Sequence, residues 1–372
     1  MVWEGLTRPI GIILLGVGLA MFFQSLNMPY LAVFSLIAGL YHLINHAIFK
    51  GLLFLCAGSV YKATGTRDIE KLGGLIKKMP QTALCFLLGA MAISALPPLN
   101  GFVSEWLTLQ AFFLGALNVM GGFKLFLGLC AALLALTGGL AAACFVKAFA
   151  ITFLAQPRSH YAQGAKEAPV SMKIGMFFLS FLAVVFGLTA GFIIKILAKV
   201  AGTAESIDVA KMSFSLNNFT LSPQGAKNIF ISTPLLALIL IVLVVVGFAI
   251  YKMLGRQKSV IYKTWDCGYY KLDSRNEYTA TAFSKPFRIA FSFFLLPYRK
   301  TQKIRESFYH VKAFTYQTYT TKVFKKYIYE PALALIFRSA KSMRRLQPGS
   351  IHLYLSYIFA ILLLLIVFMN KF

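Results

Sequence analysis

The sequence has few charged residues, and acidic residues are the scarcest of them. Of 372 residues only 13% are charged, 12 are Asp or Glu against 37 Lys or Arg, and hydrophobic residues make up 58%. A soluble domain usually carries about 25% charged residues and has no apolar run of 18 or more. This composition excludes an ordinary soluble domain and predicts an all-α polytopic membrane protein.

Motifs for metals, nucleotides and nucleophilic catalysis are also missing. The five cysteines form no CxxC pair, and four of them lie in apolar segments, where a free Cys usually acts as a small hydrophobic side chain. The sequence contains no P-loop, HExxH or nucleophile elbow. We therefore predict no metal, no cofactor and no catalytic centre in this chain, so that any electron transfer belongs to a partner.

Seven apolar segments predict membrane spans, at about 10–26, 31–60, 80–115, 123–154, 173–199, 229–252 and 351–369. The loops at 27–30 and 116–122 carry no Lys or Arg, whereas those at 61–79, 155–172 and 253–350 are basic. Because basic loops stay on the cytoplasmic side, this alternation predicts a cytoplasmic N-terminus and an outside C-terminus in the cell inner membrane.

The formal charge of +25 is concentrated beside the spans. Of the 37 basic residues, 19 lie within 255–350. This location favours anionic lipid as a partner and argues against nucleic acid. The sequence thus suggests three parts, namely a transmembrane half-module (1–254), a basic cytoplasmic or interfacial segment (255–350) and a C-terminal span (351–372). Within the basic segment, 283–296 predicts an amphipathic helix, 308–321 an extended stretch and 328–346 a further helix.

Three ionisable side chains, His42, His46 and Lys50, follow one another at four-residue spacing inside the second span. Each four-residue step on an α-helix turns about 40° and rises about 6 Å, so the three form one stripe about 12 Å long. A charge at the bilayer centre costs roughly 3 kcal/mol or more, so such groups usually face protein or water and have a function. The stripe predicts a proton relay, although polar contacts between packed helices are an alternative.

The third span contains two consecutive prolines, Pro97 and Pro98, which remove backbone donors and clash with the preceding turn. We therefore predict a discontinuous helix with halves at about 80–96 and 102–115, its irregular backbone buried by other helices. Glu105 follows the break, where the positive end of the second half-helix favours a carboxylate. It is either a proton carrier or a carboxylate that simply accepts half-helix amides.

Lys147 lies in the last third of the fourth span. One interpretation places it in the proton relay. The other lets its long side chain reach the inner membrane surface.

Several runs, taken together and in this order, resemble one known family: HLINHAIFKGLLFL, ALPPLNGFVSEWL, CFVKAFAITFLAQPRS, TWDCGY and QPGSIHLYLSYIF. They are similar to the antiporter-like, proton-translocating membrane subunits of the complex I, Mrp and membrane-bound hydrogenase superfamily. Within it they resemble the large membrane subunit, component B, of hydrogenase-4 and formate hydrogenlyase type complexes. The resemblance implies a non-redox subunit of an oxidoreductase complex, with other membrane subunits as partners.

The resemblance also implies roles for individual residues. Lys50 becomes the central proton-loading site, His42 and His46 pass protons onward through water, and Glu105 becomes the terminal carrier of the outward half-channel. Members of that family have about twice as many spans, and this chain resembles only their C-terminal half. We therefore expect either a fragment or a partner chain that supplies the missing N-terminal spans. A Na⁺/H⁺ antiporter subunit of the Mrp type and a non-conducting structural fragment remain alternatives.

Overall fold

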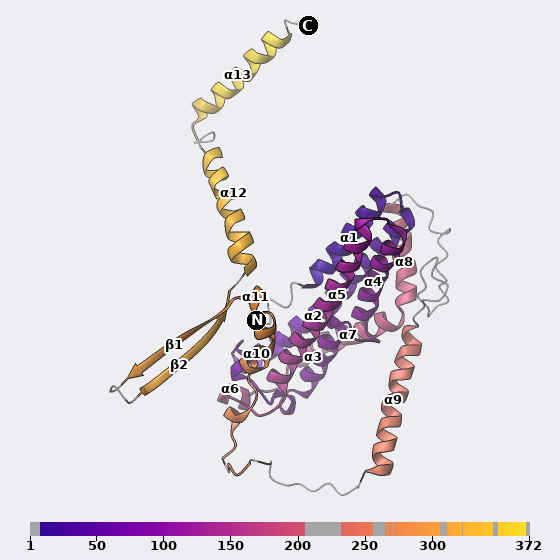
Figure 1. The fold of residues 1–372 in the computed structure, drawn as a ribbon, viewed down its shortest axis with the longest axis vertical. Helices are drawn as coiled ribbons and strands as arrows, with labels where there is room; N and C mark the ends of the chain where they lie inside the picture. Colours follow the sequence, from indigo (N-terminus) through magenta and orange to yellow (C-terminus); the bar gives the residue numbers. More distant parts are fainter. Residues whose placement is uncertain are drawn as a thin grey trace. The chain divides into compact units, whose positions relative to one another are not determined.

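The computed structural model describes residues 8–204, 232–255, 265, 267–269, 271–305, 311–321, 323–344 and 349–369 (Figure 1). The chain divides into two compact units, residues 1–283 and 284–372, which are described separately. The helices of the first unit are α1 (Arg8–Ser25), α2 (Pro29–Thr64), α3 (Pro80–Ile93), α4 (Asn100–Asn118), α5 (Gly122–Phe153), α6 (His160–Gln163), α7 (Val170–Leu188), α8 (Ala190–Ala204) and α9 (Thr233–Leu254).

The architecture is that of a polytopic helical membrane protein, as the composition predicts. Five helices among the described residues are long and apolar enough to span a bilayer, namely α2, α5, α7, α9 and α13 (Ile351–Met369). Shorter apolar helices, Ile10–Ser25 and Pro80–Ile93, accompany them. The sixth predicted span, 229–252, corresponds to α9, and its first three residues lie outside the described part of the chain.

Helix α2 is the central element of the first unit, because it packs against α1, α3, α4, α7 and α8. It begins with a proline in its first turn and ends at Gly65, whose left-handed backbone (φ 67°) lets its N–H bond the carbonyl of Tyr61. Its contact with α1 is very close. A Cβ on Gly16 would lie 2.5 Å from Cα of Gly39, so only glycine allows this approach.

The predicted discontinuous helix is confirmed. Helix α3 ends at Ile93 and α4 begins at Asn100, with the cis Pro97–Pro98 peptide between them. The interruption, residues 94–99, thus begins and ends a few residues earlier than the predicted 97–101 and has nearly the same length. The two halves meet closely at Gly101, where a Cβ would lie only 1.9 Å from the carbonyl oxygen of Ala92.

The prediction of one continuous fifth span at 173–199 is wrong, because α7 ends at Leu188 and α8 begins at Ala190. At the junction, the backbone N–H and the hydroxyl of Thr189 both bond the carbonyl of Val185, each at 2.8 Å. Gly187 lies against the other interruption, since a Cβ there would meet the carbonyl oxygen of Pro98 at 2.2 Å. The two helix breaks are thus in direct contact.

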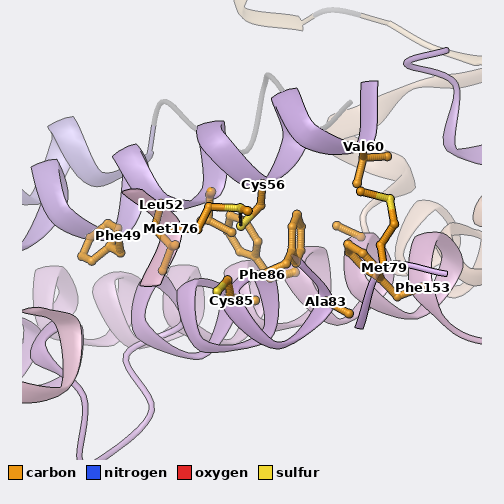
Figure 2. Packing of buried hydrophobic residues seen from close by; sticks show 14 of the residues in the cluster. Phe49, Leu52, Cys56, Val60, Met79, Ala83, Cys85, Phe86, Phe153 and Met176 are labelled. Carbon is orange, nitrogen blue, oxygen red and sulfur yellow. Dashed lines mark hydrogen bonds between the residues drawn. The ribbon is translucent and has the colours of Figure 1, made fainter. Parts of the chain in front are cut away.

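Two hydrophobic clusters fill the helical unit. One joins the first half of α2 to α1, α4 and α8. The other joins the second half of α2 to α3, α7 and the end of α5, and Figure 2 shows Phe49, Leu52, Cys56 and Val60 of α2 facing Phe86 and Met79 across it. Within the second cluster the thiol of Cys56 contacts the sulfur of Met176 at 3.5 Å.

Hydrogen bonds join three chain segments at one end of the helices. Arg158 donates to the carbonyls of Leu72 (2.8 Å), Ile151 (3.1 Å) and Tyr278 (3.2 Å), and its guanidinium lies 3.7 Å from Glu277. Two other carboxylates act on helix N-termini. Glu167 accepts the backbone N–H of Gln81 at the start of α3, and Glu70 accepts those of Ala280 and Thr281 at the start of α10 (Ala280–Ala290).

The second unit follows the start of α10 and contains α11 (Ser292–Leu295), β1 (Pro297–Arg305), β2 (Val311–Thr320), α12 (Glu330–Met343) and α13. The amphipathic helix predicted at 283–296 is divided between α10 and α11. The extended stretch predicted at 308–321 corresponds to β2, and 308–310 lie outside the described residues. Strand β2 pairs antiparallel with β1, a strand the sequence analysis missed. The helix predicted at 328–346 is α12, and 345–346 lie outside the described residues. The boundaries at 254 and 350 stay a prediction.

Candidate functional site

The stripe of His42, His46 and Lys50 lies along α2, as its spacing predicts. The two imidazole rings are nearly parallel, with centroids 6.4 Å apart and planes inclined by 6°. Both rings meet the edge of Phe49, at 6.0 and 5.7 Å. One turn further, Nζ of Lys50 lies 5.9 Å from the centroid of the Phe54 ring, where its charge gains a cation–π contact. His42 is buried at 2% exposure, and His46 and Lys50 are half-buried.

A hydrogen bond joins this stripe to the second half of the broken helix. Nδ1 of His42 lies 2.9 Å from Oγ of Ser104 in α4. The Ser104 hydroxyl is also 3.0 Å from the carbonyl oxygen of Gly101, which can only accept a proton. This arrangement favours His42 donating from Nδ1–H to Ser104, which leaves Nε2 of the neutral ring as the proton acceptor.

A pair of buried amides fixes the register of the two helices. The side chain of Asn45 donates to the backbone carbonyl of Asn100 at 3.0 Å, and the side chain of Asn100 donates to the Asn45 amide oxygen at 3.2 Å. Asn45 lies less than one turn from His42 on α2, and Asn100 is the first residue of α4. The amide pair therefore holds the start of α4 in place, one turn before Ser104.

Glu105 directly follows Ser104 on α4 and is half-buried. The structure therefore places α4, the helix that carries Glu105, beside the stripe of His42, His46 and Lys50 on α2. The prediction that the helix N-terminus favours the Glu105 carboxylate is corrected. Because α4 begins at Asn100, Glu105 lies beyond its first turn, where the effect of a helix N-terminus has largely fallen off.

Lys147 lies on a different element from the stripe. It is half-buried on α5, which packs mainly against α3 and α4. Its neighbours Phe145 and Ala148 belong to the cluster around the second half of α2. The relay and surface interpretations of this lysine both remain predictions.

Further polar groups near the site were missed by the sequence analysis. The hydroxyl of Tyr41, a fully buried residue, donates to the carbonyl of Phe186 at 2.5 Å, just before the break between α7 and α8. Among the described residues, buried polar atoms without a hydrogen-bond partner include Nε2 of His46, Nε1 of Trp106 and both amide atoms of Gln110. Tyr41 and Asn45 lie on either side of His42 in the run YHLINH, so their helical spacing was the available signal.

The described residues contain no group of three or more His, Cys, Asp or Glu side chains placed to hold a metal ion. The site instead combines imidazoles, a lysine, hydroxyls, amides and a carboxylate. These groups can accept, hold and release protons in sequence, or bind the water molecules through which protons move.

Comparisons with known proteins show what this chain is similar to. Residues 20–154, which include the stripe and Glu105, match the family model described as NADH:quinone oxidoreductase/Mrp antiporter, TM. The chain is also 35% identical over 366 residues to hydrogenase-4 component B of Escherichia coli K12, which covers 96% of this chain and 53% of that protein. It is 38% identical over 291 residues to formate hydrogenlyase subunit 3 of the same organism, covering 76% and 44% respectively.

A solved structure supports the fold. The membrane-bound sulfane sulfur reductase, an archaeal respiratory membrane complex, contains a chain that matches 99% of this one with a TM-score of 0.62 and 21% identity. This match covers 55% of that chain. The chain described here thus spans about half the length of the curated relatives it matches.

Proposed function

We propose that this chain is the C-terminal half of a proton-translocating membrane subunit in a redox-driven complex, such as a membrane-bound hydrogenase, a formate hydrogenlyase or a complex I-like oxidoreductase. The observation that carries the proposal is the hydrogen bond between His42 and Ser104, because it connects the basic stripe of α2 to the half-helix with Glu105. The family match, which includes both helices, supports the same assignment.

The proposed route starts at Lys50 and follows α2. From Lys50 a proton passes to His46 and then to His42, whose ring centroid is 6.4 Å away. Steps of this length need a bridging water, and the unpaired Nε2 of His46 is a group to which such a water can bind. From His42 the Ser104 hydroxyl leads to Glu105, from which the proton leaves on the outer side. Lys147 serves as an auxiliary group on α5.

Redox chemistry in partner subunits drives the cycle in this proposal. A neighbouring charge or a change in burial can shift the proton affinity of such a group by several pKa units, which is enough to load and unload it. The partners are other membrane subunits of the assembly, including a chain or a chain segment that supplies the missing N-terminal spans. The chain lies in the cell inner membrane with a cytoplasmic N-terminus and an outside C-terminus.

The test uses the assembled complex reconstituted in vesicles. We expect Lys50→Ala and Glu105→Gln to abolish or greatly reduce proton pumping, because each removes a titratable group from the route, while subunit assembly stays intact. Lys124→Ala is the matched control, since it removes an exposed cation of α5 away from the route. Proton uptake is followed with a pH-sensitive dye and assembly by native gel. Full pumping by both variants would show that the relay assignment is wrong.

Sodium exchange is a second candidate, because the matching family includes Mrp antiporters as well as quinone oxidoreductases. In that case transport in vesicles depends on Na⁺, and Glu105→Gln abolishes the sodium dependence together with proton movement. A non-conducting structural fragment predicts a different result, in which both variants assemble and the complex pumps at the rate of the unsubstituted protein.

A further inference from the structure

Three side chains with buried polar atoms lie beyond the candidate site, toward the side that the charge pattern predicts to be outside. Ser35 of α2 is fully buried and Gln110 of α4 is only 4% exposed. Within the part of the chain that the structure describes, the Ser35 hydroxyl, both amide atoms of Gln110 and the buried indole Nε1 of Trp106 have no hydrogen-bond partner. Folded proteins rarely leave such atoms unsatisfied, because each one costs free energy. We call Ser35, Trp106 and Gln110 the outer polar group.

The outer polar group follows the candidate site along two neighbouring helices. Ser35 precedes His42 by two helical turns, so it lies on the same face of α2, about 10 Å nearer the start of that helix. The side-chain hydrogen bonds that join α2 to α4 fix an antiparallel register, in which Ser35 lies level with Gln110. Trp106 is one turn before Gln110 on the same side of α4.

Helix α4 leads from the candidate site to the outer surface. From Glu105 to its last residue, Asn118, it rises about 20 Å at 1.5 Å per residue. Between these two residues its polar side chains are those of Trp106, Thr108 and Gln110. The Thr108 hydroxyl already donates to a backbone carbonyl of its own helix at 3.0 Å. The indole N–H and the amide are therefore the groups of α4 that are available to bind a small polar molecule between the site and the outside.

Water fits the outer polar group better than a cation or a partner subunit does. The group offers N–H donors from an indole and an amide, an acceptor in the amide oxygen, and a hydroxyl that serves as either. Water uses donors and acceptors together, whereas a cation bonds only the oxygens and leaves the indole N–H unsatisfied. Because Gln110 is buried within this chain, its amide is also out of reach of a neighbouring subunit.

We propose that the outer polar group binds ordered water, and that this water carries protons from Glu105 toward the outer end of α4. Each water accepts one proton from the inner side and releases another on the outer side, so it is regenerated at every step. The members of the group act as positioning residues, since they hold the water and do not themselves gain or lose a proton. This inference rests on the proposed function, because it supplies the outward step of the same route.

The bound water can be tested on the purified full chain, without any transport. X-ray pulses produce hydroxyl radicals from water, bound water included, and the radicals oxidise the nearest reactive side chains. Mass spectrometry should find Trp106 oxidised in the unsubstituted chain. Gln110→Met should lose most of this oxidation, because methionine keeps the length of glutamine but has no amide. Trp265 is the internal reference, since it is 85% exposed and should be oxidised equally in both chains.

The outward proton step is tested in the assembled complex reconstituted in vesicles. We expect Gln110→Met to slow pumping about tenfold, because a well-placed proton-transfer step is worth about tenfold or more. The ratio of the rates in H₂O and D₂O should rise in this variant, since the interrupted proton transfer then limits the rate. A purely structural role would leave this ratio unchanged. Gln24→Met is the matched control, because it removes the same amide at an exposed position of α1 and should alter neither quantity.

Two results would overturn the inference alone. One is oxidation of Trp106 that is absent in the unsubstituted chain or unchanged in Gln110→Met. The other is pumping at the unsubstituted rate in Gln110→Met while Glu105→Gln stops it, an outcome that leaves the proposed function intact. If Glu105→Gln pumps fully, the proposed function is wrong, and the outward step fails with it. If Gln110→Met does not assemble, Trp106→Phe removes one donor and keeps an aromatic ring, and its pumping rate and isotope ratio decide the outcome.

Discussion

At the scale of single residues, the hydroxyl of Ser104 has the most consequential position. It accepts from His42 across two helices and also bonds the carbonyl of Gly101 near the start of its own helix. Ser104 and His42 are both buried, so neither group can replace the lost bond with bulk water. A buried donor left without its partner costs about 1–3 kcal/mol.

Ser104→Ala should therefore lower stability by about 1–3 kcal/mol and slow proton pumping, because it removes the link between His42 and α4. Ser104→Thr keeps the hydroxyl and should retain most of both properties. Thermal unfolding can be followed with a thiol-reactive dye, since Cys56 and Cys85 are buried in the folded chain. Pumping at the normal rate in Ser104→Ala would separate this hydroxyl from the route.

At the scale of elements, two interrupted helices, α3–α4 and α7–α8, meet at their interruptions. The break between α3 and α4 could be predicted, because consecutive prolines exclude a continuous helix whatever surrounds them. The break between α7 and α8 could not, because Gly187, Thr189 and Gly191 weaken a helix without excluding it. Thr189 ends α7 only where the neighbouring backbone at Pro98 and the hydroxyl of Tyr41 supply contacts from elsewhere in the chain.

Gly187→Ala should destabilise the helical unit by about 1–3 kcal/mol, because the added methyl would lie 2.2 Å from the carbonyl oxygen of Pro98 and must displace backbone. Gly128→Ala is the control, since nothing lies within 4 Å of its Cβ, and it should be neutral or slightly stabilising. Dye-detected unfolding of both variants measures the difference. Equal unfolding midpoints for Gly187→Ala and Gly128→Ala would mean that the two helix breaks can move apart without a loss of stability.

In the candidate site, too, features that depend on neighbouring residues could be predicted, and features that depend on distant residues could not. Helical spacing alone placed His42, His46 and Lys50 on one side of α2, because the period of a helix is known. Spacing gave no information about Ser104 or Asn100, since their contacts join residues 62 and 55 positions apart. Strand β1 was missed for a similar reason, as its basic sequence becomes a strand through pairing with β2.

At the scale of the whole molecule, hydrogen bonds join separate segments of the helical unit at the end that the charge pattern predicts to be cytoplasmic. The loop 65–79, the loop 154–169 and residues 277–281 are separated by roughly 80 to 210 positions, and they are joined by Arg158, Glu277 and Glu70. Among the described residues, three acidic residues at this end, Glu70, Glu167 and Glu277, accept backbone N–H groups of a different chain segment. These carboxylates join the loops to one another, while lysines of the loop 65–79, such as Lys71 and Lys77, stay exposed.

Arg158→Ala should weaken the contacts among these three segments at the same time. Each hydrogen bond to a charged group contributes about 1.5–3 kcal/mol, and three carbonyls lose their donor at once. Trypsin should then cut faster after Lys71 and Lys77, which are exposed in the tied loop. Lys166→Ala removes an exposed cation from the same end and should leave the cleavage rate unchanged. A cleavage rate in Arg158→Ala equal to that of the unsubstituted chain would contradict the role given to Arg158.

The absence of a side chain at Gly187 has a mechanical consequence. With no side chain between α7 and the Pro98–Asn100 backbone, a rotation or slide of α7 must push that backbone along with it. Asn100 starts α4, so the displacement reaches Ser104 one turn later and changes its separation from His42. Pressure on α7 from a neighbouring protein would therefore alter the His42–Ser104 hydrogen bond, the contact on which the proposed proton route depends.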